Sequence, residues 1–202
     1  MFEKIIQKFK ENNISVIPVE NNEEACRKVL EIIPKKSSIG YGGSITLESI
    51  GLFDKIKSGD YEFYDKSKAV YGSEEYFKLV DLSQHVDYFL SSSNAITRDG
   101  KIVNMDRTGN RVSSIIFGPK HVIIVVGKNK IVDDVDSAIE RIRNIAAPLN
   151  AKRLKLNTPC VKTGRCMDCS SPDSICCSTV IIHKQFKPNR ITIILVNKDL
   201  GY

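Results

Sequence analysis

The pattern of apolar and polar positions predicts a chain of alternating helices and strands. Apolar residues recur at positions i, i+3, i+4 and i+7 in residues 2–9 and again in 26–33, the spacing that places them on one face of a helix. Cys26 belongs to the second of these faces, so we expect it to be a small core residue. The clearest helix begins near Ile131 and is expected to end at Pro148. Further helices are expected over 47–59, 73–85 and 110–118.

Short apolar runs between these helices are typical of strands. They lie at residues 14–19, 37–43, 61–65 and 121–127. The last run, "HVIIVVG", is apolar throughout, which favours a strand that is covered on both faces. Helices alternating with such strands predict an α/β fold in three layers around a mostly parallel sheet. We find no linker or repeat and therefore expect one domain over residues 1–202.

Two hairpins are also predicted. Asp99-Gly100 separates two extended runs, a strong signal for a type I′ turn. Nearer the end, "TVIIHKQ" (179–185) and "RITIILVN" (190–197) are joined by "FKPN" and indicate a hairpin, or two strands with a tight connection.

Composition limits the classes of function. The chain has 202 residues and a net charge of +6, and its basic residues are spread along it. A nucleic-acid binder would concentrate them with aromatic residues between them, so no nucleic-acid partner is expected. Charges interrupt the apolar residues of 1–13, unlike a signal peptide, and no apolar run is long enough to span a bilayer. We therefore expect a cytoplasmic protein with no membrane partner.

The stretch "GYGGSITLE" (40–48) predicts a glycine turn between a strand and a helix. Such a turn offers free backbone N–H groups and the positive end of a helix dipole to a phosphate or carboxylate. Gly42 and Gly43 would let a ligand approach the backbone, and the hydroxyls of Ser44 and Thr46 could contact the anion. The alternative is an ordinary turn in which Ser44 caps the helix.

A second set of polar residues lies where predicted strands end and the helix near residue 110 begins. Its members are Asn94, Asp106, Asn110 and Arg111. Ligands of open α/β sheets gather at such places, and Arg111 could bind a carboxylate or phosphate with its forked guanidinium. The alternative is a structural network in which Asp106 and Arg111 brace a tight turn.

Five of the six cysteines lie in residues 158–177, with the spacing C-x5-C-x2-C-x6-C-C. Thiols stay reduced in the cytoplasm, so disulfides are disfavoured and a metal or redox role gains weight. The pair Cys166 and Cys169 suits two ligands of one metal site. Cys160 and either Cys176 or Cys177 would complete four ligands. The spacing is compatible with an iron–sulfur cluster and with structural zinc, while redox-active or inert thiols are the alternatives.

The sequence also resembles a known family. Residues 91–132, which contain "NAIT-x-DG", "D-x-x-GNR" and "FGP-x-x-V", and the following "RIRNIAAPLNAKRL" look like the LUD domain family. The resemblance covers nearly the whole chain from residue 40 onward. It implies a fold similar to that of sugar-phosphate isomerases, CoA transferases and formyltetrahydrofolate cyclo-ligases, with a glycine-rich loop that holds an anionic ligand.

The family is associated with a multi-subunit system that oxidises L-lactate to pyruvate, in which partner subunits carry iron–sulfur clusters. Gly42, Gly43, Ser44 and Thr46 match its anion loop. The positions that match its central motif are Asn94, Asp99, Gly100, Asp106, Gly109, Asn110 and Arg111. The cysteine run is not found in every member, and the catalytic glutamate context of a CoA transferase is missing.

Two functional hypotheses follow. In the first, the protein is an electron-transfer or assembly component of lactate utilisation. It holds an iron–sulfur cluster at Cys160, Cys166, Cys169 and Cys176 and meets iron–sulfur partner subunits. In the second, it is a stand-alone enzyme or binding protein for a small anionic molecule, and zinc fixes the cysteine loop. A homo-oligomer is compatible with both.

Overall fold

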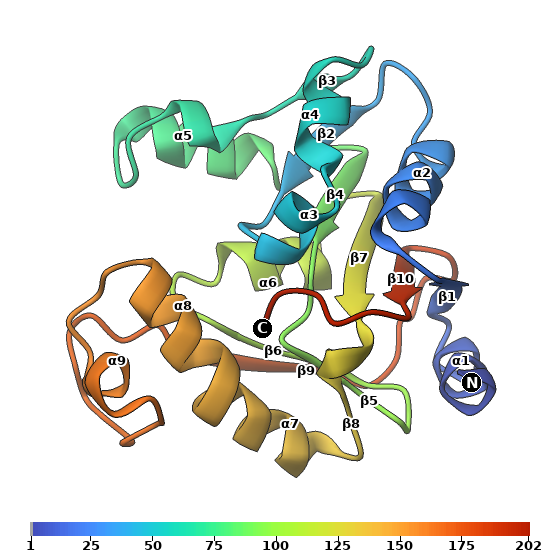
Figure 1. Cartoon of the computed structure of the whole chain (residues 1–202). Helices are drawn as coiled ribbons and strands as arrows, with labels where there is room; N and C mark the ends of the chain where they lie inside the picture. The colour runs from blue at the N-terminus through green and yellow to red at the C-terminus, as the bar shows by residue number, and fades with distance from the viewer. Residues whose placement is uncertain (1) are drawn as a thin grey trace.

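The structure of the protein is a computed structural model that describes residues 2–202, and its main feature is a parallel sheet (Figure 1). The sheet has the strand order β1-β10-β7-β4-β2-β3, and every pairing in it is parallel. Its strands are β1 (Ser15–Val19), β2 (Ser38–Tyr41), β3 (Glu62–Phe63), β4 (Tyr88–Ser91), β7 (His121–Gly127) and β10 (Ile191–Val196). The predicted α/β class with a mostly parallel sheet is confirmed.

A second, smaller sheet lies beside the first and was not expected from the sequence. Its order is β8-β5-β6-β9, with β5 and β6 antiparallel, β6 and β9 antiparallel, and β5 and β8 parallel. Its strands are β5 (Ala95–Thr97), β6 (Ile102–Asp106), β8 (Ile131–Val132) and β9 (Ser178–Ile182). This sheet packs on α7 (Val135–Arg141) and on the first residue of η3 (Ile142–Ala146) through a small core of Ala95, Val103, Ala138 and Ile142.

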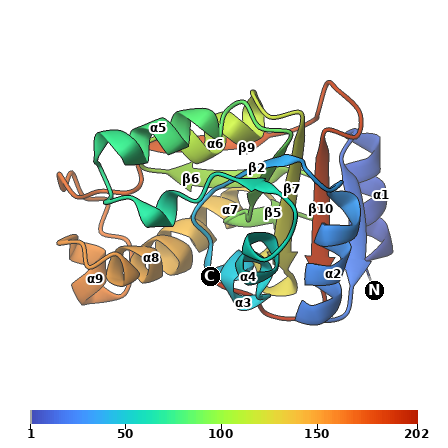
Figure 2. The same ribbon diagram turned by 90° about the horizontal axis from the view of Figure 1, so that it is seen from above.

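The helices and the small sheet cover both faces of the main sheet (Figures 1 and 2). The chain forms helices α1 (Glu3–Glu11), α2 (Asn22–Ile32), α3 (Ile45–Ser49), α4 (Leu52–Lys57), α5 (Glu74–Leu82), α6 (Asn110–Ile116), α7 (Val135–Arg141), α8 (Ala147–Arg153) and α9 (Pro159–Thr163). Shorter helical segments are η1 (Lys66–Lys68), η2 (Lys128–Lys130) and η3 (Ile142–Ala146). Side chains of α2, α3 and α4 pack on one face, and those of α1, α6 and the small sheet pack on the other.

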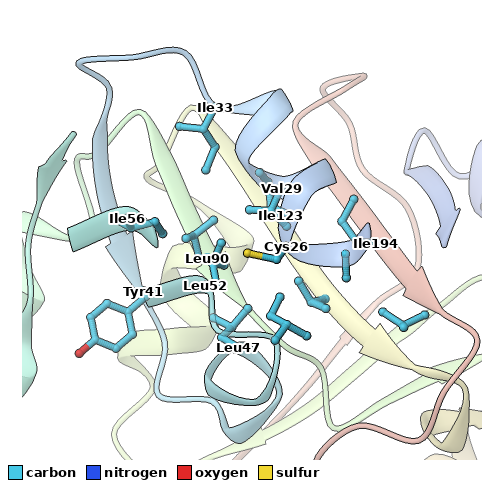
Figure 3. Packing of buried hydrophobic residues seen from close by; sticks show 14 of the residues in the cluster. Cys26, Val29, Ile33, Tyr41, Leu47, Leu52, Ile56, Leu90, Ile123 and Ile194 are labelled. Atoms are coloured by element: carbon cyan, nitrogen blue, oxygen red, sulfur yellow. The ribbon is translucent and has the colours of Figure 1, made fainter. Parts of the chain in front are cut away.

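Strand β7 shows how the sequence builds these two cores. Ile123 and Val125 point into the core beneath α2, whereas Val122 and Ile124 point into the opposite core, because successive side chains of a strand alternate between its faces. Cys26 lies among the apolar side chains of the first core (Figure 3). Its prediction as a core residue is confirmed.

The turn at Asp99-Gly100 does join two antiparallel strands, but its predicted type is wrong. A type I′ turn needs a positive φ at both central residues. Gly100 has φ 86°, whereas Asp99 is not among the residues with positive φ. The Gly100 N–H donates to the Thr97 carbonyl at 3.0 Å and the Thr97 N–H to the Lys101 carbonyl at 2.9 Å. This is the three-residue loop in which glycine supplies the left-handed position.

Two further predictions were made from local sequence, one about how two strands pair and one about the bounds of a helix, and each is corrected by the structure. Of the two alternatives for the segments near the end, the hairpin is wrong, because β9 pairs with β6 in the small sheet and β10 lies between β1 and β7. The two segments do form two strands, joined by residues 183–190. The helix predicted from near Ile131 to Pro148 begins instead at Val135, after the strand β8, and does not end at Pro148, which lies near the start of α8. A π-helical segment, η3, precedes it, and the altered hydrogen bonding of such a segment accommodates a proline that has no N–H to donate.

Within residues 2–202, no helix has the length and apolar character that crossing a bilayer requires.

Candidate functional site

A cavity of about 530 Å³ opens where three neighbouring strands of the main sheet end. The chain after β2 lines it with residues 43–46, the chain after β4 with residues 92–94, and the chain after β7 with Lys130. The carboxyl edge of a parallel sheet is the usual place for a ligand. The other walls include residues 105–108, 110 and 111, parts of η3 and α8, Lys66, Tyr71 and Tyr76, residues 175–176, and Tyr202.

The residues of the glycine turn divide into two groups. Gly43, Ser44 and Thr46 line the cavity, whereas Gly42 does not. The Gly42 N–H donates to the Leu90 carbonyl at 2.9 Å, so it is committed to backbone pairing. A Cβ atom at Gly42 would lie 2.8 Å from side-chain carbons of Arg111, whereas one at Gly43 would meet nothing within 4 Å. Gly42 therefore makes room for Arg111, and Gly43 faces open space.

The expected hydroxyl contacts also differ between the two residues. Ser44 Oγ accepts the Leu47 N–H at 3.3 Å as the N-cap of α3, as the capping interpretation predicts. Thr46 is only 1% exposed, and its Oγ1 atom accepts a hydrogen bond from Lys130 at 2.9 Å. Thr46 therefore positions another group at the cavity.

The second predicted set meets at this cavity, since Asn94, Asp106, Asn110 and Arg111 all line it. The N–H donors of the Arg111 guanidinium are nevertheless all hydrogen-bonded to protein acceptors. Its acceptors are Asp106 Oδ2 (3.2 Å), Asn104 Oδ1 (2.7 Å), the Ser92 carbonyl (3.2 Å), Asn94 Oδ1 (3.1 Å) and the Met105 carbonyl (3.0 Å). A guanidinium has five N–H donors, and each has a partner. The geometry favours the interpretation of Arg111 as the centre of a bracing network.

Asn94 is held by this network and still borders the cavity. Its Oδ1 atom accepts the Met105 N–H at 3.0 Å in addition to the Arg111 bond. Its side-chain Nδ2 atom makes no hydrogen bond with another residue in the described part of the chain. Asn94 is thus oriented to offer an N–H donor to a ligand.

Four cationic residues that were not predicted from the sequence line the same cavity: Lys66, Arg107, Lys130 and Arg153. Lys66 donates to the Tyr41 carbonyl at 2.8 Å. Burial lowers the pKa of Lys66 to about 8. The guanidinium of Arg107 makes no hydrogen bond or ion pair with the other residues that the structure describes, so its fork is available.

Lys130 is the most deeply buried of the four, at 3% exposed. Its Nζ atom donates to Thr46 Oγ1 at 2.9 Å and to Ser92 Oγ at 3.0 Å. Burial, and then the charges of Arg141 and Arg111, lower the pKa of Lys130 to about 7. The signal that could have indicated this residue is its place directly after the apolar strand β7, where side chains of an α/β sheet meet the ligand.

Positive charge exceeds negative charge around the inner wall. Among residues 2–202, Arg111 has one carboxylate partner, Asp106. Arg141 lies outside the cavity lining and donates to the carbonyls of Asn129 and Asn94, at 3.0 and 2.8 Å. Within the described part of the chain, Lys130 Nζ donates to two hydroxyls, those of Thr46 and Ser92, and has no carboxylate partner. Buried charges without counter-charges are costly, and an anion in the cavity would offset that cost.

The cysteine segment forms a second, smaller cavity of about 90 Å³. Four thiols line it, those of Cys160, Cys166, Cys169 and Cys176. All are free cysteines. Burial, and then the neighbouring thiols of Cys166, Cys160 and Cys169, raise the pKa of Cys176 to about 11. The structure therefore gathers the four residues that were predicted as ligands around one space.

Two hydrogen bonds distinguish these cysteines. The Asp168 N–H donates to Cys166 Sγ at 3.4 Å, within the Cys-x2-Cys turn, and such N–H···S bonds tune metal-bound thiolates. Cys177 Sγ lies 3.5 Å from the Ser174 carbonyl and does not line the small cavity. The geometry thus favours Cys176 over Cys177 as the fourth member of the set.

No three His, Cys, Asp or Glu side chains of residues 2–202 are arranged so that they could hold a metal ion as they stand. Metal binding therefore stays a prediction. The chemistry of the donor set, four free thiols around one cavity, fits an iron–sulfur cluster or zinc.

Comparison with known proteins bears on the whole chain. The sequence matches the family model described as the LUD domain over residues 2–196. A DUF162 family protein from Deinococcus radiodurans, known from a crystal structure, is 15% identical with a TM-score of 0.54. That alignment covers 98% of this chain and 99% of the other, and it shows a shared fold. No curated protein matches the sequence.

Ribose-5-phosphate isomerases give partial likenesses. A D-ribose-5-phosphate isomerase solved with phospho-erythronic acid is 16% identical, with a TM-score of 0.38 over 55% of this chain and 53% of its own. Ribose-5-phosphate isomerase A from Methanocaldococcus jannaschii is 11% identical, with a TM-score of 0.37 over 56% of this chain and 55% of its own.

Proposed function

Because the chain belongs to the LUD domain family, which is associated with lactate utilisation, we propose that it serves the oxidation of L-lactate to pyruvate. In this proposal it is a subunit that binds a small anion in the large cavity and an iron–sulfur cluster at the cysteine segment. Partner subunits that carry iron–sulfur clusters would exchange electrons with it in the cytoplasm.

The observation that carries the proposal is the contact between the two cavities. Ile175, Cys176 and Ala147 line both of them. A cluster held by Cys160, Cys166, Cys169 and Cys176 would therefore border the ligand cavity. When bound, it would supply one-electron transfer.

The protein's own residues account for recognition of the anion. Arg107 offers a forked guanidinium with no protein acceptor among residues 2–202, and Lys66 retains two of its three ammonium donors after its bond to Tyr41. Asn94 adds an amide donor oriented by Arg111. A carboxylate can accept from several such donors at once.

Anaerobic purification followed by an absorption spectrum and analysis of iron, sulfide and zinc tests the cluster. We expect a brown protein that contains iron and sulfide. Colourless protein with zinc would support the alternative, a stand-alone protein for an anionic molecule with a structural metal. Protein that contains none of these after anaerobic purification would contradict both interpretations of the cysteines.

The volume of the large cavity favours a second candidate ligand class. About 530 Å³ lies in the range of sites for molecules much larger than lactate, roughly 300–1,000 Å³. Apolar side chains of Ile142, Leu154 and Leu156 line part of it. A larger molecule with an anionic group and an apolar body would fill this space, as the alternative of a stand-alone enzyme or binding protein requires.

Calorimetric titration with lactate, pyruvate and inorganic phosphate tests the anion site. Arg107→Ala should weaken binding of any of them about tenfold or more, because a hydrogen bond to a charged group contributes about 1.5–3 kcal/mol. Arg98→Ala is the matched control, since Arg98 pairs with Asp133 at an exposed position and does not line the cavity. Equal affinity in both variants would contradict the assignment of Arg107.

A further inference from the structure

Lys130 has a hydrogen-bonding environment that suits a neutral amine. Its Nζ atom lies 2.9 Å from Thr46 Oγ1 and 3.0 Å from Ser92 Oγ. Both hydroxyls have a carbonyl acceptor of their own, since Thr46 Oγ1 donates to Leu200 at 3.4 Å and Ser92 Oγ donates to Ser93 at 3.3 Å. Each hydroxyl therefore directs a lone pair at Lys130 and receives one N–H from it.

The count of hydrogens follows from these partners. A neutral amine has two N–H groups and one lone pair, whereas an ammonium ion has three N–H groups. The hydroxyl oxygens of Thr46 and Ser92 accept two N–H hydrogens from Nζ. Within the described residues, Nζ has neither a third acceptor nor a carboxylate partner. The neutral form satisfies both hydroxyls and leaves its lone pair at the wall of the large cavity.

The surrounding charges act in the same direction. Arg141 and Arg111 both disfavour a further positive charge at Lys130, and burial adds to their effect, so the pKa of this amine falls to about 7. A substantial fraction of Lys130 is then unprotonated at neutral pH. Desolvation beside other cationic groups is the arrangement that activates lysine as a nucleophile.

We propose that Lys130 forms a reversible imine with a 2-oxo acid bound in the large cavity. The cationic wall selects a carboxylate, and the amine selects a carbonyl carbon. A 2-oxo acid carries both groups on adjacent carbons. Its negative charge would also offset the positive charge of a protonated imine. The inference depends on the proposed function only in taking a small carboxylate as the ligand of this cavity.

The reaction is a condensation with no net oxidation. The lone pair of Lys130 Nζ forms a bond to the carbonyl carbon, and the π electrons of the C=O bond move to oxygen. That oxygen takes up the proton that nitrogen loses. The resulting carbinolamine loses its hydroxyl group with the second nitrogen proton as water, which leaves a C=N bond. Hydrolysis reverses the sequence and restores the amine.

Reductive trapping tests the proposal on the full chain. Protein incubated with pyruvate and sodium cyanoborohydride should gain one reduced pyruvyl group, which intact-mass measurement detects and peptide mapping should place on Lys130. Lactate is the matched control ligand because it has the same carboxylate and no carbonyl, so it should give no adduct. Excess lactate or phosphate should slow trapping by pyruvate.

Variants make the assignment specific. Lys130→Ala should lose the adduct, while Lys128→Ala, which changes an exposed lysine of the same short helix η2, should keep it. Peptide mapping of the wild type gives the same answer if Lys130→Ala does not fold. An adduct on Lys66 or spread over exposed lysines would overturn the proposal. So would calorimetric binding of pyruvate with no adduct, a result that leaves the anion site standing. Pyruvate that neither binds nor reacts would overturn both.

Discussion

Arg111 and Asp106 form an ion pair with Nε 3.2 Å from Oδ2, and their side chains are only 15% and 13% exposed. Both border the ligand cavity. This pair ties the end of β6 to the start of α6 and is the anchor of a network that reaches Asn94 and the backbone after β4. Its position makes it a determinant of stability and of the shape of the site.

Arg111→Leu should lower the free energy of unfolding by about 3–5 kcal/mol, the range for removal of one partner from a buried pair. The physical reason is that Asp106 and the amide oxygens around it lose their donors. Chemical denaturation measures the change. Arg98→Leu should have little effect, because Arg98 and Asp133 form an exposed pair. A mutant that keeps wild-type stability and loses only anion binding would instead make Arg111 a direct ligand.

Gly42→Ala and Gly43→Ala should behave differently although the two glycines are adjacent. A Cβ atom at Gly42 would lie 2.8 Å from Arg111 carbons and 3.1 Å from Ser91 Oγ, so we expect a loss of about 1–3 kcal/mol from overpacking. Gly43→Ala should fold as the wild type does, because its Cβ atom meets nothing within 4 Å. Thermal melting of both variants tests this pair, and equal melting temperatures would contradict it.

Cys176→Ser should reduce metal retention much more than Cys177→Ser. Cys176 lines the cavity of the other three thiols, while Cys177 lies outside its lining and near the Ser174 carbonyl. Metal content after anaerobic purification is the measurement. The double variant Cys166→Ser with Cys169→Ser should abolish retention, and full retention there would refute the ligand assignment.

Lys130 should make stability depend on pH. Its pKa is lowered to about 7 in the folded protein, against about 10.4 in an unfolded chain. Between these values the unfolded state binds more protons, so the free energy of unfolding rises with pH across this window. The destabilisation caused by burying Lys130 is fully present below about pH 7. The stability of Lys130→Met relative to the wild type should therefore be greatest near pH 7 and decrease toward pH 10. Subtracting the two curves removes the contribution of Lys66, whose pKa is lowered for the same reason. A difference that does not vary with pH would contradict the lowered pKa.

Local patterns were enough to predict most elements of the fold. The spacing of Ile5 and Phe9 and the apolar run of β7 reflect burial that each segment shows in its own sequence. Pairing between distant segments cannot be predicted from the sequence of each segment alone. Two apolar strands close in sequence, β9 and β10, joined different sheets, because pairing depends on which edges the rest of the chain leaves open.

For the site, too, the features set by local sequence could be predicted, whereas those set by distant segments could not. Motif residues such as Asn94 and Asp106 line the cavity, and their position at strand ends is visible in the sequence. The burial of Lys130 could not be predicted from the sequence, because a lysine after a strand is ordinarily solvated. Residues 200–201, distant in sequence, contribute to its enclosure: a Cβ atom at Gly201 would lie 3.5 Å from Lys130 Nζ, and the Leu200 carbonyl accepts from Thr46 Oγ1.

The ladder between β6 and β9 has a mechanical consequence. Ser178, the residue after Cys177, is in register with Asp106, and the Cys177 N–H donates to the Asp106 carbonyl at 3.1 Å. A displacement of the cysteine segment would therefore act on the backbone of Asp106, whose carboxylate pairs with Arg111. Binding of a metal by the cysteine segment should therefore change the affinity of the large cavity for an anion. By thermodynamic reciprocity, anion binding should change the metal affinity by the same factor.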